Sequence, residues 1–318
     1  MANAKVSLLG KDILDIASLS VDEIKLILST ARKMKKVLES NEKKFPVLRG
    51  KSIINLFYEA STRTRTSFEL AGKYLGADVI NINTAASSVA KGECLRDTIL
   101  TFQSMQCDAI VLRHPAEGAA VYASKIARPV VLNAGDGAHA HPTQALLDLL
   151  TISETGKSFK GLKMVILGDI LYSRVARSNI AAWKKLGADV HIAGPVTLMP
   201  KDAQALGVTA HNRIEEALEG ADVVDVLRIQ LERQKKGLFP STREYSRIFG
   251  LTEQRLALAK PDVTLIHPGP MNRGLEISWD LGYGSQQKIR EEVHNGVAVR
   301  MALLYLTLCQ GDEIENLN

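Results

Sequence analysis

The pattern of apolar and polar residues begins with an amphipathic helix near the N-terminus. Ser20 and Glu23 have the three-residue spacing of a capping box, in which each side chain bonds the backbone of the other. Ile24, Ile27 and Ala31 then repeat at the three- and four-residue spacing of one helical face. The pattern therefore predicts a helix that starts directly after Ser20.

Short apolar runs bounded by polar turns follow this helix, and stretches with helical periodicity separate them. The runs in the first half of the chain are 52–57, 78–82, 109–112 and 130–133. The runs in the second half are 164–167, 190–193, 208–210, 223–227 and 263–266. Strands that alternate with helices are typical of parallel sheets. The pattern predicts an α/β fold with two domains, each a mainly parallel sheet flanked by helices.

The junction between the two halves is expected to be helical. No stretch rich in Gly, Ser or Pro separates them, and residues 143–154 have a helical pattern that would run from one half into the other. A rigid connection of this kind permits hinge closure. The segment 286–309 predicts a helix, with Gly296 as an expected break, that returns to pack on the first half. The expected domains are residues 1–143 plus 291–318, and residues 144–290.

Composition places the chain among soluble globular proteins. Its 318 residues, 46% of them hydrophobic, are enough for two cores. Charges interrupt the first apolar residues, so no secretory signal is predicted, and the longest apolar run, 296–309, contains Arg300 and is too short to span a membrane. Cys94, Cys107 and Cys309 lie too far apart to indicate a disulfide framework or a zinc site. We expect a protein of the reducing cytoplasm.

The charge of the chain is basic, with a formal net charge of +5. A nucleic-acid-binding protein would show basic residues interleaved with aromatic ones, whereas the only dense basic run here, 32–36, falls on a predicted helix as a solvated face. Many other arginines stand at strand ends and loop starts. This placement favours small anionic substrates over nucleic acid.

The strongest local signal is the segment 57–69, FYEASTRTRTSFE, which follows an apolar run and opens a helix. Ser61, Thr62, Arg63 and Thr64 would place hydroxyls, backbone N–H groups and a guanidinium at a helix N-terminus, where the helix dipole favours an anion. A lone Ser-Thr-Arg would be read as an ordinary capped helix with solvated arginines. The complete string favours a phosphate site.

Three further motifs accompany this one, and together they carry a resemblance. They are Arg113-His-Pro115 at a strand end, the Gly-rich stretch 133–144 (NAGDGAHAHPTQ), and the stretch 267–274 (HPGPMNRG). In this order the four motifs resemble those of the aspartate and ornithine carbamoyltransferases, over essentially the whole chain. The resemblance implies the transfer of a carbamoyl group from carbamoyl phosphate, without a cofactor.

The resemblance also implies roles for residues of the first half. The phosphate would bind at Ser61 to Thr64 with Arg63, and Arg113 would contact both the phosphate and the carbonyl oxygen. His141 would donate to that oxygen as negative charge develops, and Gln144 would bind the amide. A metal site at His139 and His141 is disfavoured, because no suitable third ligand stands nearby in the sequence.

In the second half, arginines again follow expected strands. Arg174 begins a helix after Gly168-Asp169, and Arg228 and Gln230 follow a later strand. Guanidinium groups bind carboxylates with two parallel hydrogen bonds, so two arginines suit the two carboxylates of aspartate. The resemblance gives Arg174, Arg228 and Gln230 to this substrate. No GxGxxG motif supports the alternative of a nucleotide site.

The acceptor distinguishes the two branches of the family. Ornithine enzymes carry a His-Cys-Leu-Pro element and an acidic Ser-Met-Gly loop, and this chain has neither; it has His267-Pro-Gly-Pro270 instead. Gly269 replaces the leucine of some members, but the backbone carbonyls of Gly269 and Pro270 can still serve the substrate. The resemblance therefore implies carbamoylation of L-aspartate in de novo pyrimidine biosynthesis.

The stretch 85–92 has small residues and no periodicity, and is predicted to be a mobile loop. In the family this loop reaches a neighbouring subunit's site, and the matching residues here are Ser87 and Lys91; Ala90 stands where some members have a second lysine. The resemblance implies a homotrimer with shared active sites, and it leaves open further assembly with a regulatory chain or a dihydroorotase. A two-domain protein that binds such ligands without turnover is the alternative from a different class.

Overall fold

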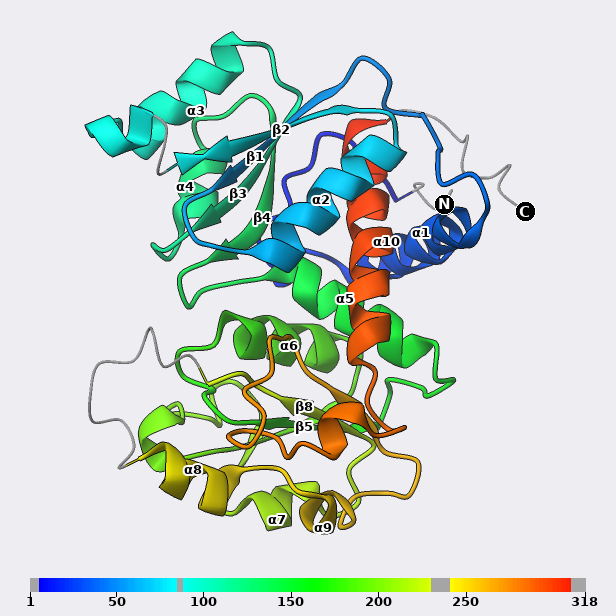
Figure 1. Ribbon diagram of the computed structural model, residues 1–318, viewed down its shortest axis with the longest axis vertical. Helices are drawn as coiled ribbons and strands as arrows, with labels where there is room; N and C mark the ends of the chain where they lie inside the picture. The colour runs from blue at the N-terminus through cyan, green and yellow to red at the C-terminus, as the bar shows by residue number, and fades with distance from the viewer. Residues whose placement is uncertain (1–5, 85–87, 230–240, 310–318) are drawn as a thin grey trace, which may run out of the picture. The chain divides into compact units, whose positions relative to one another are not determined.

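The computed structural model describes residues 6–84, 88–229 and 241–309 of the chain (Figure 1). The chain divides into two compact units: Met1–Leu150 with Val293–Asn318, and Thr151–Glu292. The first limit lies beyond the expected residue 143, because most of the helix α5 (Pro142–Ser153) belongs to the first unit.

The first unit is built on a four-stranded parallel sheet with the strand order β2-β1-β3-β4. Its strands are β1 (Ser52–Phe57), β2 (Asp78–Asn83), β3 (Ala109–His114) and β4 (Val130–Asp136). Its helices, besides α5, are α1 (Val21–Glu39), α2 (Thr62–Tyr74), the 3-10 turn η2 (Ser88–Lys91), α3 (Leu95–Ser104), α4 (Ala119–Ser124) and α10 (Ile289–Leu308). The capping box predicted for Ser20 and Glu23 is present at the start of α1.

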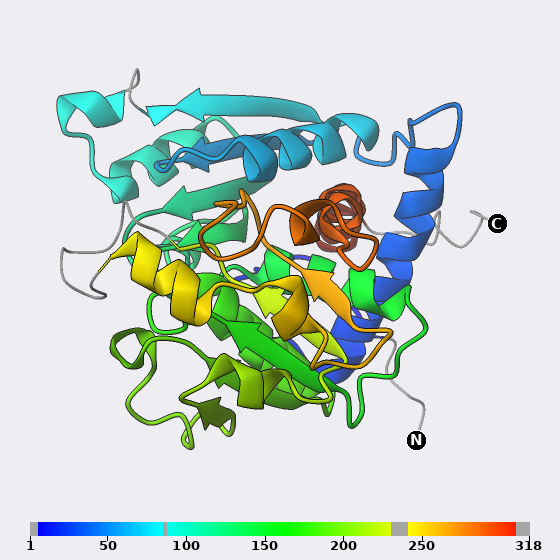
Figure 2. The ribbon, with the colours of Figure 1, turned by 60° about the horizontal axis from the view of Figure 1, so that its bottom comes forward.

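Helices cover both faces of this sheet, as Figure 2 shows. Ile54 and Leu56 of β1 belong to an apolar cluster with residues of α3 and α4, whereas Ile53 points to the other face, where Gly72 of α2 approaches it. β1 is buried almost throughout, and β2 is the exposed edge strand. The alternation along β1 thus fixes which helix lies on which face.

The last helix, α10, differs from the prediction, because it continues through Gly296 without a break. Most of its residues from Ala298 to Tyr305 are buried. A Cβ atom at position 296 would lie 2.5 Å from Nη1 of Arg300. Glycine at this position therefore provides room for a buried guanidinium one turn later, and it does not interrupt the helix.

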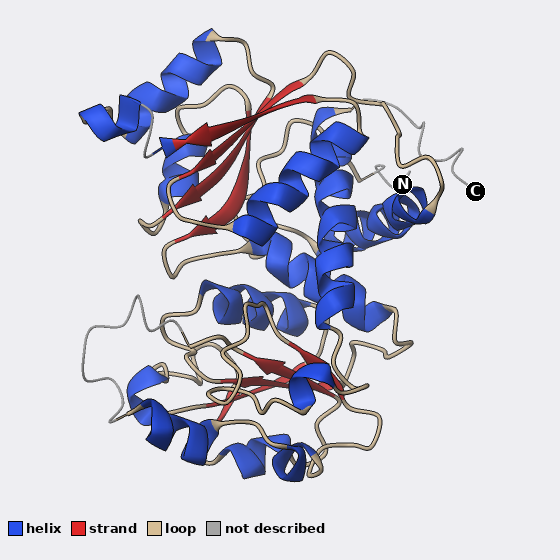
Figure 3. Ribbon diagram, viewed as in Figure 1, coloured by secondary structure: helices blue, strands red, loops and turns tan. Residues whose placement is uncertain are grey.

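The second unit is built on a five-stranded parallel sheet with the strand order β7-β6-β5-β8-β9. Its strands are β5 (Lys163–Leu167), β6 (Asp189–Ala193), β7 (Thr209–His211), β8 (Val223–Val226) and β9 (Thr264–Ile266). Its helical elements are α6 (Arg174–Lys185), η3 (Val196–Leu198), α7 (Ile214–Leu218), α8 (Thr242–Phe249), α9 (Glu253–Leu256) and η4 (Leu281–Tyr283). In Figure 3, α6 lies on one side of the sheet and α7 and α9 lie on the other.

The predicted α/β class and each expected strand are confirmed, with strand ends that differ by a few residues. β4 continues past Asn133 to Asp136 because their polar side chains bond each other inside the unit, Nδ2 of Asn133 donating to Oδ1 of Asp136 at 2.8 Å. The expected loop at 85–92 contains the short turn η2 in its described part. No helix in the described ranges is long and apolar enough to cross a membrane.

Candidate active site

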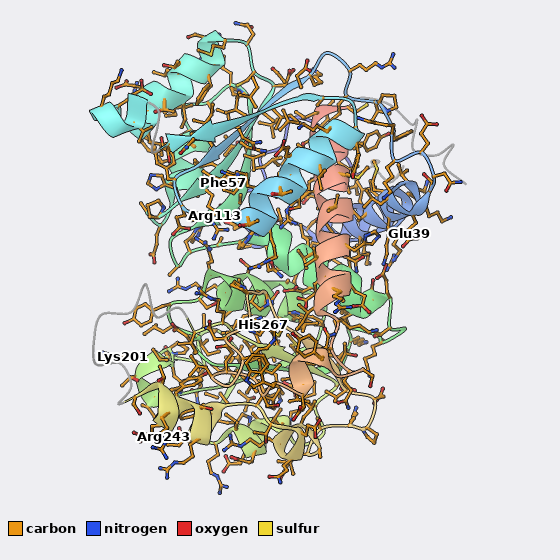
Figure 4. The ribbon with its side chains drawn as sticks, viewed as in Figure 1. Glu39, Phe57, Arg113, Lys201, Arg243 and His267 are labelled. Atoms are coloured by element: carbon orange, nitrogen blue, oxygen red, sulfur yellow. The ribbon has the colours of Figure 1, made fainter. Side chains whose placement is uncertain are left out.

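All four strands of the first unit's parallel sheet end at one edge. In parallel sheets this carboxyl edge is where ligands bind. The register pairs Phe57 of β1 with Arg113 of β3, and His114 of β3 with Asp136 of β4. Figure 4 shows Phe57 and Arg113 together at this edge. The segments that follow β1 and β4 carry Ser61 to Thr64, His141 and Gln144, and Lys91 follows β2.

The N-terminus of α2 is arranged for an anion. Ser61 occupies the N-cap position with an extended backbone, and its side chain makes no capping hydrogen bond. The first turn contains no acidic residue; Thr62 and Arg63 are exposed, and Thr64 is buried. The first N–H groups of a helix have no partner within it, so this end offers donors and a positive dipole to a phosphate.

Arg113 is held in place by neighbours of its own unit. Its Nε atom lies 3.3 Å from Oε2 of Glu59, and its Nη1 atom donates to the carbonyl oxygen of Ala134 at 3.4 Å. The side chain is only 14% exposed, so it is not the solvated arginine of a strand end. Sequence reasoning missed Glu59, although it stands two residues before Ser61 in the same motif.

The Gly-rich segment after β4 is organised by the buried carboxylate of Asp136. This carboxylate accepts from the backbone N–H groups of Gly118 at 2.8 Å and Ala140 at 3.1 Å, and from Asn133. Nδ1 of His139 lies 3.0 Å from the same carboxylate. Within the described ranges, no three His, Cys, Asp or Glu side chains form a group that could hold a metal. His139 therefore supports the shape of the loop.

His141 directly precedes α5, and Gln144 lies in its first turn. Both are nearly buried, at 5% and 8% exposure. Nε2 of Gln144 donates to Oδ1 of Asp148 one turn later, at 2.9 Å. The first unit thus brings the N-terminus of α2, Arg113, His141 and Gln144 onto segments that leave one edge of its sheet. Together these residues offer cationic and neutral hydrogen-bond donors and one side-chain amide.

The second unit has a corresponding carboxyl edge. Ser173 caps α6, its Oγ accepting from the N–H of Ala176 at 3.1 Å, and Arg174 is the first residue of that helix. Arg174 is 3% exposed and Arg228, beyond β8, is half-buried, so neither is an ordinary solvated side chain. Two guanidinium groups therefore stand on segments that leave the carboxyl ends of β5 and β8.

The turn after β9 is rigidly held. The N–H of Gly269 donates to Nδ1 of the fully buried His267 at 2.8 Å, so the ring proton sits on Nε2, which lies 3.3 Å from Oε1 of Glu276. The Gly269–Pro270 peptide bond is cis, and Gly269 has a φ of 58°, which favours glycine. Nδ2 of Asn272 donates to the carbonyl oxygen of Ile229 at 3.1 Å. The turn is thereby fixed to the segment that carries Arg228.

Two predicted residues, Ser87 and Gln230, lie outside the described part of the chain. Lys91 is exposed and ends η2. The other predicted site residues lie at, or on segments that follow, the carboxyl ends of the strands in their own unit.

Comparison with known families matches both units. Residues 11–154 match the family domain "Aspartate/ornithine carbamoyltransferase, carbamoyl-P binding domain", and residues 160–307 match the corresponding "Asp/Orn binding domain". The chain belongs to the aspartate/ornithine carbamoyltransferase family. Among its relatives, an aspartate carbamoyltransferase catalytic subunit from Desulforamulus reducens is 59% identical over 296 residues, which are 93% of this chain and 95% of the relative. One from Moorella thermoacetica is 57% identical over 94% of this chain and 97% of the relative.

Solved structures from both branches of the carbamoyltransferase family resemble the fold. The ornithine carbamoyltransferase from Pyrococcus furiosus has a TM-score of 0.85 at 30% identity, covering 95% of this chain and 98% of that one. The aspartate transcarbamoylase from Trypanosoma cruzi, in complex with carbamoyl phosphate and aspartate, has a TM-score of 0.85 at 31% identity, with the same coverage. Because the two scores are equal, the fold by itself does not identify the acceptor.

Proposed function

We propose that this chain transfers the carbamoyl group of carbamoyl phosphate to the α-amino group of L-aspartate, giving N-carbamoyl-L-aspartate and phosphate. The names of its relatives at 59% and 57% identity support this proposal. We further propose that it acts in the cytoplasm, in de novo pyrimidine biosynthesis.

The observation that carries the choice of acceptor is the pair of arginines in the second unit. Arg174 and Arg228 lie on segments that follow the carboxyl ends of β5 and β8 in one sheet. Each guanidinium can bind one carboxylate of aspartate with two hydrogen bonds. Ornithine presents a cationic side chain, which such a pair would repel. Gln230 and the backbone carbonyls of Gly269 and Pro270 complete the proposed aspartate contacts.

Carbamoyl phosphate is assigned to the first unit. Its phosphate would accept hydrogen bonds from the start of α2, through Ser61, Thr62 and Thr64, with Arg63 supplying charge. Arg113 would contact the phosphate and the carbonyl oxygen. His141 would donate to that oxygen, and Gln144 would bind the amide group.

The chemical step needs no covalent intermediate with the protein. The lone pair of the neutral aspartate amine attacks the carbonyl carbon, and the carbonyl electrons move to the oxygen, where Thr64, Arg113 and His141 stabilise the developing charge. The carbonyl then re-forms as the bond from carbon to the bridging oxygen breaks. Phosphate leaves with that electron pair, and a phosphate oxygen takes the amine proton. The rate enhancement comes from holding the two substrates in the reactive orientation and from hydrogen-bond donors that are already in place.

The site is further proposed to be shared between subunits of a homotrimer, with Ser87 and Lys91 donated by the neighbouring chain. The exposure of Lys91 at the end of η2 supports this assignment, since an exposed cation at the end of a turn is available to a partner's anion.

The test is a direct assay of the purified chain with carbamoyl phosphate and either aspartate or ornithine. We expect N-carbamoyl-aspartate and stoichiometric phosphate from the first mixture, and no citrulline from the second. Citrulline as the main product would refute the acceptor assignment. Binding of carbamoyl phosphate by calorimetry without turnover of either acceptor would identify a binding protein instead.

A further inference from the structure

One face of α5 carries an amide and a carboxylate that fix each other. Gln144 and Asp148 are four residues apart, and therefore adjacent on the helix surface. Nε2 of Gln144 lies 2.9 Å from Oδ1 of Asp148, and the two residues are 8% and 1% exposed. An ionised carboxylate only accepts hydrogen bonds, so the NH2 group of Gln144 must face it. The carbonyl oxygen Oε1 is then directed to the other side of the amide.

The charge of Asp148 is balanced by a buried arginine from the last helix. Arg300 of α10 is 4% exposed. Burial lowers the pKa of Arg300 to about 10, against the opposing effect of the Asp148 carboxylate. The guanidinium therefore stays charged at neutral pH, and it favours the ionised, acceptor-only form of Asp148.

Arg300 is itself held between the two helices that carry the predicted carbamoyl phosphate contacts. Its Nη2 atom donates to Oγ1 of Thr143 on α5 at 3.1 Å, and its guanidinium carbon lies 5.2 Å from the ring centre of Phe68 on α2. Gly296 leaves the space that Nη1 occupies. The guanidinium thus has a defined position, and so does the negative charge that it balances.

We propose that Asp148, supported by Arg300, is a positioning residue that fixes Oε1 of Gln144 as the acceptor for the NH2 group of carbamoyl phosphate. This inference rests on the proposed function, and it assigns to Asp148 the discrimination between carbamoyl phosphate and acyl phosphates that lack an amide. With the Gln144 amide turned over, its NH2 group would face the NH2 group of the substrate. A site built to bond an N–H group rejects analogues that lack it.

The variant Asp148→Asn removes the predicted constraint on Gln144 with little change in volume. An asparagine amide can present either its carbonyl oxygen or its NH2 group to Gln144, so residue 148 no longer requires the NH2 group of Gln144 to face it. Oε1 of Gln144 is then no longer held toward the substrate. We expect the affinity for carbamoyl phosphate, measured by calorimetry, to fall about ten- to hundredfold. The affinity for acetyl phosphate, in which a methyl group replaces the amide, should stay unchanged.

Gln144→Met provides the second arm, because it removes the acceptor at nearly constant volume. It should lower the ratio of the affinity for carbamoyl phosphate to the affinity for acetyl phosphate to the same extent as Asp148→Asn. The double variant should show no further loss, since both changes remove the same interaction. This arm still tests whether Gln144 reads the amide, on which the inference depends, even if Asp148→Asn does not fold. An unchanged affinity ratio in Gln144→Met would show that Gln144 does not read the amide, and would overturn the inference.

The second unit offers a matched control. Nδ2 of Asn179 donates to Oδ2 of Asp225 at 2.8 Å, and both residues are buried. Asp225→Asn should lower the melting temperature but leave the affinity ratio unchanged. If Asp148→Asn instead weakens both ligands by the same factor, Asp148 has only a structural role. Failure of the unsubstituted chain to bind carbamoyl phosphate at all would overturn the proposed function itself, which is a distinguishable result.

Discussion

Arg63 stands exposed in the first turn of α2, and that turn contains no acidic residue. Charge-assisted hydrogen bonds to phosphate are worth roughly 1.5 to 3 kcal/mol, and a phosphate left partly unpaired loses more. Arg63→Ala should therefore lower kcat/KM for carbamoyl phosphate at least about a hundredfold in steady-state assays. Arg65→Ala is the matched control on the same helix and should retain most activity. Equal losses in both variants would contradict the assignment of Arg63.

The stacked imidazoles of His191 and His211 predict a sensitivity to acid. Nδ1 of His191 lies 2.8 Å from Nε2 of His211. Burial, then the charges of His191 and Lys163, lower the pKa of His211 below its ordinary value, with Glu216 opposing. The folded chain then takes up the proton less readily than the unfolded chain, so this contribution to stability is present above about pH 6.5 and is lost as the pH falls below it.

His211→Asn removes that titration. Between about pH 7.5 and pH 5.5, the melting temperature of the unsubstituted protein should fall further than that of the variant. Thermal unfolding followed by circular dichroism measures both. Parallel curves for the two proteins would mean that His211 does not contribute to the acid response.

At the scale of elements, two helices of similar length begin with serine in different ways. The Ser173 side chain caps α6, whereas the Ser61 side chain makes no capping bond at α2. Loss of a capping serine typically costs about 1 kcal/mol. Ser173→Ala should therefore lower the free energy of unfolding by about that amount in urea titrations. Ser61→Ala should leave stability unchanged but weaken carbamoyl phosphate binding; destabilisation there would indicate an ordinary cap.

The elements themselves could be predicted because their signals are local. Apolar runs predicted the strands, and the spacing of Ser20 and Glu23 predicted the start of α1. The partners of the site residues were not predictable in this way. Arg300 bonds Thr143, 157 residues earlier, and no local pattern reports such a pairing. The prediction of a helix break at Gly296 was wrong for the same reason. The glycine makes room for the guanidinium of Arg300 packed against it, and the helix continues through it.

At the scale of the whole molecule, the proposed trimer predicts complementation between inactive chains. Lys91→Ala chains would donate no lysine to a neighbour, and Arg63→Ala chains would have a defective phosphate site of their own. In mixed rings, some interfaces pair an intact loop with an intact site. Activity after dissociation and reassembly should return up to roughly a quarter of the unsubstituted value for equal mixing. Reassembly verified by mass measurement without recovered activity would place Lys91 outside its neighbour's site.

The first unit is discontinuous in sequence, and this has a consequence for biosynthesis. Its core needs α10, which contacts Gly10 through the carbonyl oxygen of Thr307 and Phe45 through the ring of Tyr305. Proteins usually fold domain by domain from the N-terminus as the ribosome synthesises them. Here the segment 151–292 is contiguous and can fold while the earlier-made residues still lack their last helix. The apolar surfaces that α10 will cover thus stay exposed during most of translation, and chaperones have that interval in which to bind them.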